Sequence, residues 1–165
     1  MNYYENVVFD YLRADRSLFI NTEFCIQLNE SDNPDTSGPH WYCDAVVCDW
    51  ARHEIFLCEI SYERQLSSLK KRLNGWNKNW TGLLSALCRD GSLPSDWLVR
   101  PWLFVPEFLV DQLINALNKM KNSEEGLKFH PRITTLEMVQ PWLYRSWDRR
   151  EEEKKPESIP AEMRE

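Results

Sequence analysis

Apolar residues recur along the first third of the chain with two different spacings, and these spacings predict the order of its helices and strands. Residues 2–14 have apolar positions at helical intervals. Residues 17–28, 40–50 and 54–62 are rich in β-branched and aromatic side chains, which is typical of strands. The short link before residue 54 predicts a hairpin. The last of these strands is almost continuously apolar, so we expect it to be central and covered on both faces.

A single apolar stripe predicts a long helix over residues 64–88. Its members lie three or four residues apart, as residues on one face of a helix do: Leu66, Leu69, Leu73, Trp76 and Trp80. Because glycine weakens a helix, Asn74-Gly75 is the point where we expect a bend or an interruption. Since Trp76 and Trp80 continue the leucine stripe, they are predicted to lie in the core and to stack on bases only if exposed.

The remaining chain predicts one more strand and further helix. Residues 97–106 indicate a strand, and Pro101 makes it an edge strand or a broken one. Residues 107–121 are amphipathic and helical, 127–136 are ambiguous between strand and loop, and 136–147 suggest a helix. The order of elements predicts an α/β fold with a mixed central sheet flanked by helices, α-β-β-β-α-β in its core.

Composition bounds the class of protein. Its 165 residues predict one domain over residues 1–148, and the charged segment 149–165 predicts a fraying helix and then a flexible tail. A formal charge of -6 excludes a globally basic nucleic-acid coat protein. The chain has no apolar run of about 20 residues and no basic start with a long apolar stretch, so we expect a cytoplasmic protein without a membrane partner.

Two carboxylates occupy unusual positions inside predicted strands. Asp44 lies among apolar residues of the second strand, and Glu59 lies near the end of the third. Strand interiors seldom accept acids, because a buried charge must be paired or bound to a metal. Since a short turn joins the two strands, we expect these acids to lie close together, with Glu5 from the first helix as a third carboxylate. Such an oxygen-rich set suits Mg²⁺ or Mn²⁺.

The order of elements, with CDAVVCDWARHEIFLCEIS at its centre, resembles the restriction-endonuclease-like, or PD-(D/E)XK, nuclease superfamily. The resemblance covers about residues 2–106. It implies a nuclease that hydrolyses phosphodiester bonds with a divalent metal. Asp44, Glu59 and Glu5 match the family's acidic positions, and the Ile60 carbonyl is the further ligand that we expect.

The sequence departs from the family pattern where the family carries a lysine. Ser61 stands at that position, and a hydroxyl cannot replace the lysine's charge. Some family members recruit a lysine from the following helix. At about 100° per residue Lys70 lies on the flank of the leucine stripe, whereas Lys71 points into solvent. Lys70 is therefore the candidate replacement, and Gln65 or Lys70 is expected to orient the attacking water.

Nucleic acid is the partner that the local charge favours. Between residues 59 and 90 the chain carries twice as many basic as acidic side chains: Arg64, Lys70, Lys71, Arg72, Lys78 and Arg89 against Glu59, Glu63 and Asp90. A basic helix beside an acidic site suits a phosphate backbone. A plain solvated helix face is the alternative interpretation of the run at 70–72.

Three functional hypotheses remain open from the sequence. The first is a metal-dependent nuclease, and the second is a catalytically inactive domain of the same fold that serves binding or assembly. The third is an interaction domain without nuclease ancestry, and a homodimer is compatible with any of them. Asp44 has a purely structural alternative, in which it caps a turn or pairs with Arg52 or Arg64. Acids paired with arginines would favour the inactive domain.

Overall fold

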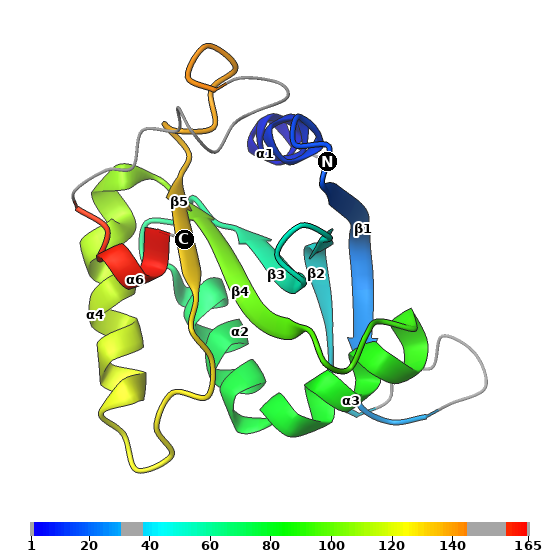
Figure 1. The fold of residues 1–165 in the computed structure, drawn as a ribbon. Helices are drawn as coiled ribbons and strands as arrows, with labels where there is room; N and C mark the ends of the chain where they lie inside the picture. The colour runs from blue at the N-terminus through cyan, green and yellow to red at the C-terminus, as the bar shows by residue number, and fades with distance from the viewer. Residues whose placement is uncertain (1, 31–37, 145–157, 165) are drawn as a thin grey trace.

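A five-stranded mixed sheet with helices on both faces forms the body of the protein (Figure 1). The computed structural model describes residues 2–30, 38–144 and 158–164. The elements follow one another as α1 (Tyr3–Arg13), β1 (Leu18–Gln27), β2 (His40–Asp49), β3 (Glu54–Ile60), α2 (Ser67–Lys78), α3 (Trp80–Gly91), β4 (Leu98–Val105), a short 3-10 helix η1 (Glu107–Leu109), α4 (Val110–Lys121), β5 (Arg132–Thr135) and α6 (Ala161–Arg164). The predicted class, a mixed sheet flanked by helices, is confirmed.

The strands lie in the sheet in their order along the chain. β1, β2 and β3 form an antiparallel meander, and β4 and β5 are then added in parallel. The two parallel additions need crossovers, which α2 with α3 and then α4 supply. β3 is therefore the central strand, as predicted, and all of its residues from Ile55 to Glu59 are buried.

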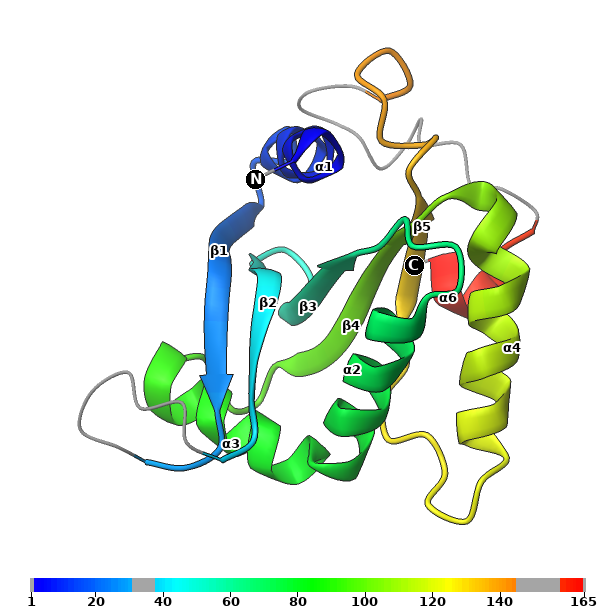
Figure 2. The ribbon, with the colours of Figure 1, turned by 180° about the vertical axis from the view of Figure 1, so that it is seen from behind.

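The sheet separates two apolar layers. On one face, Leu57 and Leu103 pack with α2, α3 and α4. On the other, Phe56 and Trp102 pack with α1 and with the segment that follows β5. Figures 1 and 2 show the two sides of the sheet. α1 lies near one end of the strands, and α2 and α4 lie on the face opposite to the one that α1 contacts. This alternation along β3 and β4 is the two-residue period of strands buried on both faces.

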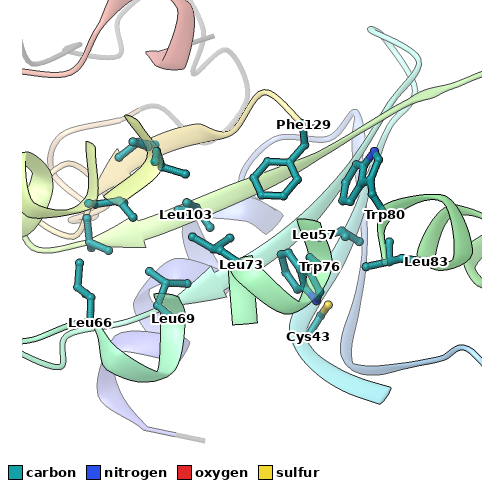
Figure 3. Packing of buried hydrophobic residues seen from close by; sticks show 14 of the residues in the cluster. Cys43, Leu57, Leu66, Leu69, Leu73, Trp76, Trp80, Leu83, Leu103 and Phe129 are labelled. Carbon is teal, nitrogen blue, oxygen red and sulfur yellow. The ribbon is translucent and has the colours of Figure 1, made fainter. Parts of the chain in front are cut away.

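The predicted leucine and tryptophan stripe forms the centre of the larger layer. Leu69, Leu73, Trp76 and Trp80 are buried, so the prediction that both tryptophans lie in the core is confirmed. Figure 3 shows Trp76 beside Cys43 of β2, with Leu57 and Leu83 close by. Trp76 therefore joins α2 to the sheet and to α3.

The predicted long helix is interrupted, but not at the position that the sequence suggested. α2 ends at Lys78 and α3 begins at Trp80, and Asn79 between them leaves the helical conformation with φ −109° and ψ 19°. The Asn79 side chain donates a hydrogen bond to the Gly75 carbonyl. Gly75 stays helical, and a Cβ there would lie 3.2 Å from the Trp41 ring. This glycine thus allows α2 to approach β2 closely.

β4 lies between β3 and β5, so the prediction of an edge or broken strand is wrong. Pro101 pairs in register with Leu57 of β3. The ladder with β5 begins only at Trp102, opposite Arg132. At Pro101 the strand therefore has one paired side, and the missing N–H needs no partner on the other.

The end of the chain differs in part from its prediction. The ambiguous segment 127–136 contains the edge strand β5, whereas the expected helix over 136–147 is a series of turns as far as residue 144, and residues 145–147 lie outside the described residues. Of the predicted flexible tail, residues 158–164 are described. Ile159 is only 1% exposed within the core, and α6 packs against β5. No described helix is long and apolar enough to cross a membrane.

We expect Trp76→Ala to destabilise the fold strongly, because it removes a fully buried ring, 0% exposed, between α2 and the sheet. The expected loss in the free energy of unfolding is about 3–5 kcal/mol. Trp142→Ala is the matched control, since Trp142 is 78% exposed and its loss should change little. Urea unfolding followed by circular dichroism measures both variants, and similar losses would contradict this account of the core.

Candidate functional site

Asp44 lies on β2 at a local distortion of the sheet. The ladder between β1 and β2 pairs Thr22 with Ala45 and Phe24 with Cys43, and omits the residues between them, Glu23 and Asp44. Glu23 has a φ of 55°, in the left-handed region that a residue other than glycine seldom adopts. The distortion therefore falls directly beside Asp44, because at this point the ladder omits one residue on each strand.

The carboxylate of Asp44 reaches the neighbouring strand. Its Oδ2 accepts a hydrogen bond of 2.7 Å from the Ile60 N–H at the end of β3. The ladder between β2 and β3 starts at the pair Ala45 and Cys58, so Asp44 and Glu59 stand one step beyond it, on adjacent strands. The alternative role of a turn cap belongs instead to Asp49, whose Oδ1 accepts the N–H groups of Ala51 and Arg52.

Glu59 is held by an arginine from α2. The Nη1 atom of Arg72 lies 2.6 Å from both carboxylate oxygens of Glu59. The same nitrogen donates to the Tyr42 carbonyl of β2, also at 2.6 Å. The side chain of Glu59 is 7% exposed and that of Arg72 30%. One guanidinium therefore joins α2 to β2 and β3, and it supplies the counter-charge of Glu59 whenever this buried carboxyl group ionises.

Burial and mutual repulsion dominate the electrostatics of the two acids. Burial raises the pKa of Glu59, and the negative charge of Asp44 raises it further, to about 8, although Arg72 acts in the opposite direction. Burial also raises the pKa of Asp44, while the hydrogen bond from Ile60 and the charge of Arg72 lower it and the charge of Glu5 raises it. The two acids therefore form one electrostatically coupled site, as their predicted proximity requires.

Glu5 is near this site but is engaged in the helix to which it belongs. The backbone N–H and the side-chain amide of Asn2 donate to its two oxygens, at 3.0 and 2.7 Å, in a capping box at the start of α1. The ring of Tyr4 lies 4.7 Å from that of Tyr62, just after β3. The start of α1 is thereby placed close to the end of β3.

The two predicted water-orienting residues contact each other on another side of α2. The Lys70 ammonium donates to the Gln65 carbonyl at 2.7 Å, and the Gln65 side chain is exposed. Lys70 also lines a groove of about 740 Å³ between α2 and α4, together with Asp111 and Lys119. Ser61, where the resemblance would place a lysine, donates its backbone N–H to the Phe104 carbonyl. Lys71 faces solvent, as predicted.

Arg72 is the residue of the site that the sequence interpretation did not single out. It belongs to one basic run with the two preceding lysines, and that run is also compatible with a solvated helix face. A helical signal was nevertheless available, because Arg72 follows Leu69 by three residues and precedes Trp76 by four. These intervals place it on the flank of the buried stripe, above the sheet.

The described residues do not offer the donor set that the predicted Mg²⁺ or Mn²⁺ needs. Arg72 occupies both oxygens of Glu59, and Asn2 occupies those of Glu5. Ile60 meets Asp44 through its N–H rather than through the carbonyl expected to bind metal. Within the described parts of the chain, no group of three or more His, Cys, Asp or Glu side chains is arranged to hold a metal ion.

Comparison with known proteins gives no assignment. No protein-family model, curated protein or solved structure matches the chain. The functional argument therefore rests on the residues of this site.

The stability of the protein is expected to fall with rising pH because of Glu59. Between about pH 4.5, where a glutamate ionises in the unfolded chain, and about pH 8, the folded state retains a proton that the unfolded state has lost. Relative to Glu59→Gln, which has no such proton, the wild type should lose on the order of 1–3 kcal/mol across this range. Urea unfolding at several pH values measures the difference.

Glu124→Gln, at an exposed position, is the control and should show little dependence on pH relative to the wild type. A difference between wild type and Glu59→Gln that stays constant or grows with pH would mean that Arg72 keeps Glu59 ionised throughout.

Proposed function

We propose that this chain is a restriction-endonuclease-like domain that binds nucleic acid and does not hydrolyse it. The contact of Arg72 with both oxygens of Glu59 carries the proposal. Hydrolysis through the family's site needs the second acidic position to be available to a metal, and here both oxygens of that position contact a guanidinium of the chain itself. Ser61 in place of the family's lysine removes a second part of the chemistry.

The topology supports the family part of this proposal. An antiparallel meander followed by a helical crossover and a parallel strand is the order on which the resemblance rests. Asp44 and Glu59 come from adjacent strands and interact electrostatically, as the two matched acidic positions should. Glu5, the third matched position, also raises the pKa of Asp44.

The surface of α2 supports nucleic acid as the partner. The helix carries four basic residues and no acidic one, in a chain of net charge -6. Lys71 and Lys78 are exposed and seven residues apart, so both lie on one face of α2, with exposed Asn74 between them. A row of cations beside a polar side chain suits contacts to successive phosphates.

A metal-dependent nuclease remains the second candidate, and the convergence of Asp44 with Glu59 favours it. In that case Arg72 would be the cation recruited from the following helix, the role predicted for Lys70. It would have to leave Glu59 when a metal binds. The two candidates differ in one outcome, which is whether the wild-type protein cuts a phosphodiester bond.

We expect no metal-dependent cleavage by the wild-type protein. The assay incubates it with single- and double-stranded DNA and RNA in Mg²⁺ or Mn²⁺, beside Asp44→Asn as the control for contaminating nucleases. Cleavage that Asp44→Asn abolishes would reject the inactive domain and establish the nuclease. Equal traces of cleavage in both preparations would identify a contaminant and leave the expectation fulfilled.

We expect binding of nucleic acid to depend on the exposed face of α2. Lys71→Glu combined with Lys78→Glu should weaken binding of a labelled oligonucleotide by about tenfold or more, and should reduce the slope of log K against log salt by about 1–2. Fluorescence anisotropy over a range of salt concentrations measures both quantities.

Lys119→Glu combined with Lys121→Glu is the matched control, because it makes the same change in net charge on exposed positions of α4. Equal weakening by the two double variants would show that net charge alone, and not α2, determines binding.

A further inference from the structure

The environment of the Arg72 Nη1 atom is that of a bound cation. Three oxygens lie 2.6 Å from it, two from Glu59 and one from the Tyr42 carbonyl. A guanidinium Nη1 carries only two hydrogens, so three such contacts cannot each have a hydrogen of their own. One hydrogen is therefore shared between the two oxygens of Glu59, and attraction between the positive charge and the surrounding oxygens, which also acts around a metal ion, adds to these hydrogen bonds.

The oxygens belong to the sheet and not to the helix that supplies Arg72. Tyr42 is on β2 and Glu59 on β3, and both stand beyond the end of the ladder that joins the two strands. The negative charge of Asp44 lies close enough to raise the pKa of both Glu59 and Arg72. The sheet thus presents a position for a cation, formed by Glu59 and the Tyr42 carbonyl beside Asp44, which we call the cation seat.

We propose that Arg72 is a built-in substitute for a divalent cation and competes with one for the cation seat. This inference deepens the proposed function, on which it rests, by giving the reason why the domain would not hydrolyse nucleic acid. With Arg72 in place, the seat is closed to metal. Without Arg72, the buried carboxylate of Glu59 loses its counter-charge, and a hard divalent ion that prefers oxygen ligands takes the guanidinium's place.

The competition is tested by metal binding and not by activity. Arg72→Ala should have a lower melting temperature than the wild type in EDTA, and MnCl₂ should raise it again. Calorimetric titration with Mn²⁺ should give binding at least about tenfold tighter for Arg72→Ala than for the wild type. Lys71→Ala is the matched control, because it removes the same charge from the exposed neighbouring position and should gain no binding.

Two further variants assign any gain to the cation seat. Arg72→Ala combined with Glu59→Gln lacks the carboxylate and should lose both the Mn²⁺ binding and the recovery of melting temperature. Arg72→Lys retains a cation and should stay closed to metal. If Arg72→Ala gains no more binding than Lys71→Ala, or if the Glu59→Gln double variant binds equally well, the proposal is overturned.

The proposal can still be tested if Arg72→Ala does not fold without metal. Should Arg72→Ala be unfolded in EDTA, MnCl₂ is expected to restore its circular dichroism spectrum, and Arg72→Gln, which keeps a polar stem against the sheet, should gain Mn²⁺ binding. If MnCl₂ does not restore the spectrum of Arg72→Ala and Arg72→Gln gains no Mn²⁺ binding, the proposal of the cation seat is overturned.

The metal-binding test of the cation seat and the cleavage test of the proposed function can fail independently of each other. Absent binding in the Arg72 variants overturns the cation seat while leaving the lack of cleavage intact. Cleavage by the wild type rejects the inactive domain, whereas a gain of metal binding on removal of Arg72 would still support the competition. Wild-type Mn²⁺ binding as tight as that of Arg72→Ala would overturn the competition itself.

Discussion

The site depends on one constraint, which is that the buried carboxyl group of Glu59 needs a counter-charge when it is ionised. Glu59 lies near the end of the central strand, where its side chain is almost completely removed from water. Leaving such a charge unpaired costs several kcal/mol, of the same order as the whole stability of a small domain. The guanidinium of Arg72 offsets this cost and at the same time fixes α2 over β2 and β3. This one contact therefore contributes both to the position of the helix on the sheet and to the chemistry of the site.

Much of the fold could be predicted because its layers impose simple periods on the sequence. The leucine and tryptophan stripe of α2 and the continuous apolar run of β3 are both direct results of where each element lies. The wrong predictions concern positions that are determined by tertiary contacts, which leave no periodic pattern in the sequence. The helix is interrupted at Asn79 rather than at Gly75, and Gly75 instead lies where a Cβ would come 3.2 Å from the Trp41 ring. Pro101 is accepted inside the sheet because β5 joins β4 only after it.

The candidate site was predictable to the extent that strand pairing determines it. A short hairpin brings Asp44 and Glu59 together whatever lies around them. The cation that contacts Glu59 depends on helix packing, and there the sequence favoured Lys70 by its angle on the helix. Arg72 is half-buried because its long side chain can leave the flank of the stripe and place its charged end at the strand terminus. A pattern of apolar positions does not contain that information.

The two borders of the sheet are protected by different means. α6 packs against β5, the strand at one border, and Ile159 of the preceding turn is inserted into the core. On the other border, Glu23 interrupts β1 with a left-handed residue and places a charge there. A straight strand from another molecule cannot continue the ladder past such a kink. The distortion at Glu23, which lies beside Asp44 of the site, thus also disfavours aggregation through pairing of edge strands.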